Sequence, residues 1–260
     1  MPHSFLQVLI VAGLAALASV GGGALALWMR TNSLILSLTA GFAGGVLLGT
    51  FAFEMLPKAK EAAGPTVTIV SFLVGFSLIY VLDLIVNRGA VAGEHADQKP
   101  RVDRLHRRRP PLGSEVSVLA GGTSAEELIE GVSIGVGLAV DPGLGLMVGL
   151  AVAMDNVSEA LSIGHLIRAE ADGRPVASRV LGWTGLIGLS LLVSAVGGWF
   201  FLRDLPDGLL GALLAIGAGA MFYLTIADLV PKAEERQFQQ SAAVAVALGF
   251  LLFFGLADLS

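Results

Sequence analysis

The chain has 260 residues, of which 55% are apolar and 14% charged, and its 16 basic and 21 acidic side chains give a formal net charge of −5. Mean hydropathy is +0.79, far above that of soluble domains, so an ordinary soluble enzyme is excluded. The basic residues gather in one segment and only 7% of residues are aromatic, which argues against a nucleic-acid-binding surface. Because the chain has no cysteine, any metal site must use oxygen or imidazole ligands.

Eight apolar runs follow one another, each close to the length of about 20 residues that a helix needs to cross a hydrocarbon core. The runs are Phe5–Met29, Leu34–Leu56, Thr66–Val86, Val116–Val140, Leu144–Ile167, Val180–Leu202, Leu209–Pro231 and Ala242–Leu259. They predict an all-α polytopic membrane protein with eight transmembrane helices, forming a single transmembrane domain over residues 1–260. No basic residue precedes the first run, and the run is about twice as long as the apolar core of a signal peptide, so we expect it to be retained.

One polar segment interrupts this pattern, from Arg88 to Glu115. It holds eleven charged residues, seven of them basic, and is predicted to be a flexible loop between the third and fourth helices. If both termini lie outside the cell, thirteen basic residues fall in cytoplasmic segments and three outside. The positive-inside rule favours this orientation, which places the loop in the cytoplasm.

Two motifs recur in helices that are expected to run in opposite directions. Residues 127–135 of the fourth run resemble residues 156–164 of the fifth, and residues 54–59 of the second resemble residues 228–233 of the seventh. These echoes predict an inverted-repeat bundle, in which many carriers place a binding site at the membrane midplane. For either echo alone, chance similarity among helices of low complexity is the alternative.

Acidic side chains gather at the middle of the fourth and fifth runs. On each run they are three or four residues apart, so they share one face of the helix. Burying an ionised carboxylate costs at least several kcal/mol unless it is paired, hydrated or protonated, and no Lys or Arg lies within the eight predicted spans. We therefore expect metal cations, protons or both to supply the countercharge. The candidate metal ligands are Glu126, Glu127, Glu130, Asp155, Asn156 and Glu159.

The structural alternative is a protonated, hydrogen-bonded acid cluster that only holds helices together. Five acids at one depth exceed what that role requires, so the site interpretation is favoured. Two further acids, Glu54 and Asp228, each stand three residues before a proline near a predicted helix end. Each could be an entrance or exit ligand, or a cap at the membrane interface.

Gly131-Val-Ser133-Ile-Gly135 matches the Gly-x-Ser-x-Gly pattern of serine hydrolases. That chemistry needs a sharp strand-turn-helix elbow, whereas this match lies within a continuous helical run. We expect the glycines to serve close helix packing instead, as in Gly45-x-x-x-Gly49 and Gly145-x-x-x-Gly149.

The order of these features resembles the ZIP (Zrt/Irt-like protein) family of divalent metal transporters over nearly the whole chain. Residues 126–131 resemble the family's H-N-x-P-E-G motif and residues 151–161 its H-N-x-P-E-G-L motif, while residues 53–59 and 221–233 resemble the endings of its second and seventh helices. The resemblance implies eight helices in a 3+2+3 inverted-repeat bundle, with a binuclear metal site formed by the six candidate ligands. Two histidines of the family motifs are acids here, Glu126 and Asp155.

This resemblance implies a transporter, not an enzyme. It would move divalent cations such as zinc, manganese or iron through a midplane carboxylate site towards the cytoplasm. Its partners would be the lipid bilayer of the cell membrane, the transported metal ions and, through the small-residue helix faces, a second copy in a homodimer. Two alternatives stay open: a proton-linked carrier of another cation, and a non-transporting homologue with a regulatory or structural metal site.

Overall fold

The structure, a computed structural model, describes residues 2–29, 31–86, 115–170, 175–234 and 238–257. Two of its segments, η1 and η3, are π-helical, and the other elements are α-helices. The elements are α1 (Pro2–Trp28), α2 (Ser33–Thr50), η1 (Phe51–Met55), α3 (Leu56–Ala63), α4 (Pro65–Val86), α6 (Glu115–Val140), α7 (Pro142–Ala169), α8 (Val176–Leu202), α9 (Asp207–Leu224), η3 (Thr225–Leu229), α10 (Val230–Ala233) and α11 (Gln239–Ala257). We call α2, η1 and α3 together the α2–α3 helix, and α9, η3 and α10 together the α9–α10 helix.

Seven helices in the described part are long and apolar enough to cross a membrane, so the chain is an all-α polytopic membrane protein. The expected fourth span corresponds to α6, which is not among the seven and carries three acidic residues near its middle. A bundle of eight spans therefore stays a prediction. The predicted loop 88–115 lies outside the described residues except for Glu115, which begins α6.

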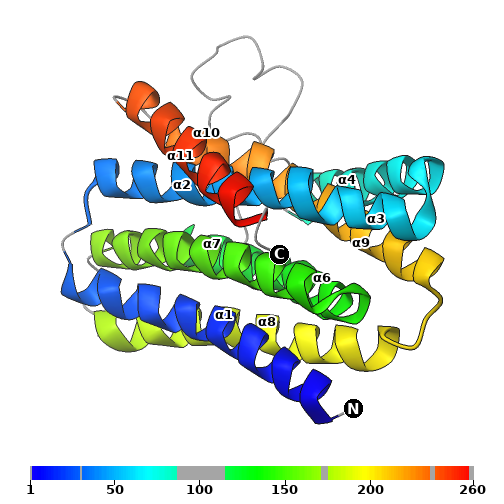
Figure 1. The fold of residues 1–260 in the computed structure, drawn as a ribbon. Coiled ribbons are helices and arrows are strands. Elements are labelled where there is room, and N and C mark those ends of the chain that lie inside the picture. The colour runs from blue at the N-terminus through cyan, green and yellow to red at the C-terminus, as the bar shows by residue number, and fades with distance from the viewer. Residues whose placement is uncertain (1, 30, 87–114, 171–174, 235–237, 258–260) are drawn as a thin grey trace.

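The two acidic helices lie at the centre of the bundle (Figure 1). On one side, α1 packs against α7 and α8, and α6 packs against α8. On the other side, α2 pairs with α11 and α4 with α9, while α2 also contacts α7 and α9 contacts α6. This arrangement surrounds the carboxylates of α6 and α7 with helices on both sides.

Glycines allow the closest of these helix pairs to form. Gly45 of α2 lies against the backbone of Val246 in α11, and Gly219 of α9 lies against the backbone of Phe72 in α4. Gly131 and Gly135 lie against the backbone of α8, and α6 continues as a helix through both. The packing role predicted for the Gly131 to Gly135 motif is confirmed, and a hydrolase elbow is excluded there.

Because a Cβ at Gly45 would collide with the Val246 carbonyl oxygen, we expect Gly45→Ala to force α2 and α11 apart. The cost of such overpacking is about 1–3 kcal/mol of unfolding free energy. Gly13→Ala in α1 is a matched control, because, apart from the neighbouring backbone of α1 itself, no described atom would lie within 4 Å of the new Cβ. Thermal unfolding of the purified variants in detergent measures the difference, and equal midpoints for the two would contradict the close contact.

The two π-helical segments occupy matching places in the second and seventh expected spans. Each is followed after one residue by a proline, Pro57 in one case and Pro231 in the other. The N–H that closes each segment donates five residues back, from Leu56 to the Phe51 carbonyl and from Val230 to the Thr225 carbonyl. Proline has no N–H to donate, and the wider turn absorbs the missing bond so that the helix continues.

This continuation corrects the predicted helix ends. The second span was expected to end at Leu56 and the seventh at Pro231, but the helices run on to Ala63 and Ala233. Glu54 and Asp228 therefore lie inside helices, in η1 and η3, rather than at helix ends.

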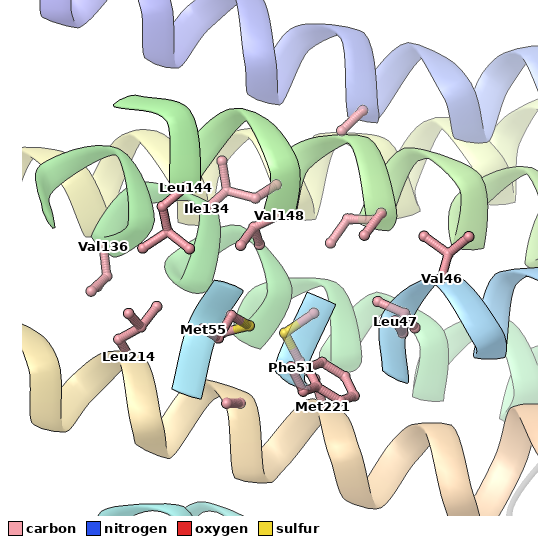
Figure 2. Packing of buried hydrophobic residues seen from close by; sticks show 14 of the residues in the cluster. Val46, Leu47, Phe51, Met55, Ile134, Val136, Leu144, Val148, Leu214 and Met221 are labelled. Carbon is pink, nitrogen blue, oxygen red and sulfur yellow. The ribbon is translucent and has the colours of Figure 1, made fainter. Parts of the chain in front are cut away.

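The main apolar core lies where α2, η1, α6, α7 and α9 meet (Figure 2). Phe51 and Met55 of η1 are 2% and 0% exposed, and the Phe51 ring packs edge-on against Phe222 of α9 with centroids 6.1 Å apart. The π-helical turn of η1 is thus held in the core, beside the helices that carry the acids.

Candidate metal-binding site

Three of the predicted ligands lie on α6. Glu127 and Glu130 are 1% and 5% exposed, and Glu126 is half-buried. Their helix is enclosed by α7, α8 and α9. The Ser194 hydroxyl of α8 donates to the Glu127 backbone carbonyl at 3.1 Å, which fixes this turn of α6 against its neighbour.

The other three predicted ligands lie on α7. Asp155 and Asn156 are 4% and 1% exposed, and Glu159 is half-buried. The Asn156 amide Nδ2 donates to the Ala15 carbonyl of α1 at 3.1 Å. This bond holds α7 against α1 and uses one of the two amide N–H donors, whereas the Asn156 Oδ1 is buried without a hydrogen-bond partner among the described residues.

The structure brings the two acidic sets together as one electrostatic cluster. Glu130 of α6 interacts with Asp155 of α7, as does Glu127. Glu159 of α7 interacts with all three acids of α6. The sequence prediction that two acidic helix faces meet is therefore supported by the packing.

Several oxygens of this cluster are buried and unpartnered. Both Oε atoms of Glu127 and the Oδ1 atoms of Asp155 and Asn156 have no hydrogen-bond partner. Leaving such groups buried without compensation is costly, and a bound cation removes the cost by coordinating them. Carboxylate and amide oxygens are hard donors, of the kind that Mg²⁺, Ca²⁺ and Mn²⁺ prefer.

The cluster is not a closed coordination shell. Among the residues that the structure describes, no three acidic or histidine side chains converge closely enough to hold one metal ion. To coordinate a shared ion, the acids must change rotamer or the helices must shift. Metal binding by the six residues therefore stays a prediction.

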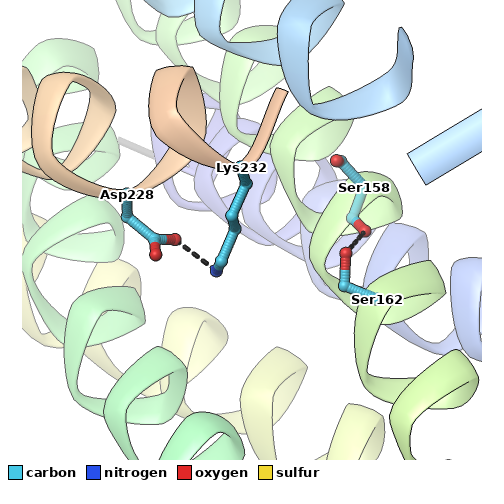
Figure 3. Close-up of polar contacts among 4 residues, drawn as sticks. All are labelled: Ser158, Ser162, Asp228 and Lys232. Atoms are coloured by element: carbon cyan, nitrogen blue, oxygen red, sulfur yellow. Dashed lines mark hydrogen bonds and ion pairs between the residues drawn. The ribbon is translucent and has the colours of Figure 1, made fainter. Parts of the chain in front are cut away.

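The sequence did not predict a basic residue that interacts electrostatically with the cluster. The α9–α10 span includes Lys232, whose ammonium forms an ion pair with Asp228 (Figure 3). The expectation that no Lys or Arg lies within a span is wrong, because the helix continues past Pro231. The spacing of Asp228 and Lys232, four residues apart, was the signal available in the sequence.

Glu54 and Lys58 show the same spacing in the α2–α3 helix but have a different arrangement. Glu54 is 3% exposed and lies within η1, inside the helix that runs to Ala63, so it does not cap a helix end. Lys58 Nζ lies 3.8 Å from the Asp141 carboxylate at the start of α7. That carboxylate also accepts the Leu144 N–H at 3.0 Å and so caps α7.

Comparison with known proteins matches most of the chain to transporters. No family model matches it. Proteins named zinc transporter ZupT from Salmonella heidelberg, Salmonella newport and Salmonella typhimurium are each 27% identical over 216 residues, covering 80% of this chain and 79% of the relative. The chain is therefore similar, over most of its length, to proteins named as zinc transporters.

This similarity supports the resemblance to the ZIP family that the motifs of α6 and α7 indicated. The match is to curated relatives that carry a transporter name, and none of these names indicates catalytic activity. The acidic cluster therefore lies in a multi-pass membrane protein that is similar to proteins named as transporters.

Proposed function

We propose that this chain carries divalent metal cations across the cell membrane towards the cytoplasm, with the carboxylates of α6 and α7 as its binding site. The observation that carries the proposal is the set of buried, unpartnered oxygens on Glu127, Asp155 and Asn156. They lie on two packed helices at the centre of a chain whose homologues are named zinc transporters. No chemical reaction is needed, because transport requires only binding, a change of access and release.

The paired π-helical segments support an inverted 3+2+3 arrangement. They lie in the second and seventh spans, each directly before a leucine-proline or valine-proline step, and each contains an acid. The packing pairs also correspond under such an inversion, since α1 contacts α7 as α8 contacts α6, and α2 contacts α11 as α9 contacts α4. This pattern is the one expected of carriers with alternating access around a central site.

The chemical type of the six predicted ligands affects which metal the chain is expected to carry. The relatives are named for zinc, so zinc is the first candidate. The six predicted ligands of this chain contain no imidazole, and an all-oxygen site raises the preference for manganese, magnesium or calcium-like ions relative to a histidine site. Affinity alone still follows the Irving–Williams order, so the difference is expected in the ratio between metals.

The proposed direction depends on the orientation of the chain, with both termini outside. This orientation places the basic segment of residues 88–115 in the cytoplasm. Apart from Glu115, that segment lies outside the described residues. We expect a cysteine introduced at Ala92, in a chain that has no other cysteine, to react with an impermeant maleimide only after the cells are opened. Labelling of intact cells would reverse the orientation and the direction of transport.

Cation flux into liposomes tests the proposal. Purified chain is reconstituted with a metal-sensitive dye inside, and Zn²⁺, Mn²⁺ or Fe²⁺ is added outside, with and without a proton gradient. We expect saturable entry of at least one divalent ion, and protein-free liposomes give the background. Flux of a different cation that requires a proton gradient would favour the proton-linked alternative. Binding without flux of any cation would favour a regulatory or structural site.

A further inference from the structure

Lys232 interacts electrostatically with the carboxylate cluster. Lys232 of α10 pairs with Asp228 one helical turn earlier, and their side chains are 27% and 15% exposed. The ammonium also interacts with Glu159 of α7 and Glu126 of α6. Its charge therefore acts on acids of three separate helices while it is ion-paired with Asp228, unlike a surface lysine, whose ion pair contributes little.

The chain contains a second lysine at the equivalent place in the repeated motif. Lys58 follows Pro57 directly, as Lys232 follows Pro231. Its side chain is 38% exposed, and it pairs with Asp141 at the end of α7 that is remote from Glu159. The two lysines share a motif but not an environment, so Lys58 serves as an internal control for Lys232.

The acidic side chains around Lys232 indicate an electrostatic role for its ammonium group. In a poorly solvated cluster, carboxylates of like charge repel one another, and a fixed ammonium relieves part of that repulsion when no metal is present. Asp155 interacts with both members of the pair, Asp228 and Lys232, which connects the pair to the ligands of α7. A lysine ammonium has no acceptor for a metal, and it repels an incoming cation.

We propose that Lys232 is a resident countercharge that lowers the divalent-cation affinity of the carboxylate site. The inference rests on the proposed function, since it assumes that the cluster binds the transported ion. A site used for transport must bind its ion well enough to admit it and weakly enough to release it. Lys232 supplies the weakening, and its pairing with Asp228 keeps that carboxylate out of the ligand set.

Equilibrium dialysis of the full-length chain in detergent against Mn²⁺ alone tests this role. We expect Lys232→Gln to lower the Mn²⁺ Kd by at least about tenfold, because one positive charge near the ion is removed. Lys232→Arg keeps the charge and is expected to retain the wild-type Kd. The matched control Lys58→Gln is also expected to retain it. An unchanged or raised Kd in Lys232→Gln, or the same tightening in Lys232→Arg or Lys58→Gln, would overturn the proposal.

Lys232→Gln leaves Asp228 without its partner and could fail to fold, so a second comparison is needed. The double variant Asp228→Asn with Lys232→Gln removes the pair as a unit and is compared with Asp228→Asn alone. We expect the double variant to bind Mn²⁺ at least about tenfold more tightly than the single variant, and equal Kd values would overturn the proposal. Wild-type chain that binds no divalent ion would instead overturn the proposed function, which separates the two failures.

Discussion

A Glu130→Gln chain is expected to lose most of its divalent-cation affinity while becoming more stable without metal. Glu130 is 5% exposed and interacts with Glu127 and Asp155, so it is both a repelling charge in the empty cluster and a ligand in the filled one. Removing a direct ligand and leaving the others unbalanced costs about 3–5 kcal/mol of binding. Metal-free stability should rise because one like charge has been removed.

The two opposite shifts are measured on one preparation, by metal dialysis and by thermal unfolding in a chelator. Glu61→Gln is the matched control, because Glu61 is an exposed acid at the end of α3 and not one of the six predicted ligands. It should change neither quantity. A Glu130→Gln chain with wild-type affinity and wild-type uptake would remove this residue from the site.

Restoring imidazole at two positions is expected to move the metal preference towards zinc. Glu126→His with Asp155→His places one histidine on α6 and one on α7, at the positions where the ZIP motifs carry histidine. Imidazole suits Zn²⁺, whereas an all-carboxylate site favours Mn²⁺ and harder ions. We expect the ratio of Zn²⁺ to Mn²⁺ uptake in direct competition to rise by at least about tenfold.

Loss of negative charge alone could also change that ratio. The control is therefore Glu126→Gln with Asp155→Asn, which removes the same two charges without adding imidazole. It should weaken both metals without raising the ratio. If zinc excludes manganese equally well in the wild type and in the double-histidine chain, the all-oxygen donor set does not determine selectivity.

The sequence predicted the meeting of acidic helices because the spacing of acids on a helix is a local property. Glu127 and Glu130, and likewise Asp155 and Glu159, share a face whatever the rest of the fold does. The role of Asn156 towards α1 depends on Ala15, which is 141 residues away, and no local pattern indicates that contact. Helical spacing also does not determine side-chain rotamers. The sequence could therefore predict the six candidate ligands but not how they would coordinate a metal ion.

The ends of the second and seventh predicted helices were wrong because proline has a different effect in this structure from the one that a sequence predicts. A proline removes one helical hydrogen bond, which in a sequence predicts a stop. In the structure the stop is avoided by the π-helical turns before Pro57 and Pro231, one of which is held by the packing of Phe51 and Met55 in the core. That packing involves distant helices, so the continuation of the helix to Lys232 could not be predicted from the sequence. The four-residue spacing of Asp228 and Lys232 was the signal that the sequence did contain.

The central claim is that the acids of α6 and α7 hold the transported ion. Its most direct test is anomalous scattering from crystals of the chain soaked in Mn²⁺, recorded at the manganese edge, which locates the ion itself. We expect a peak between α6 and α7, with oxygens of Glu127, Glu130 and Asp155 about 2.0–2.6 Å from it. If the chain transports manganese but the peak lies away from these residues, with their oxygens still unligated, the acids of α6 and α7 do not hold the transported ion.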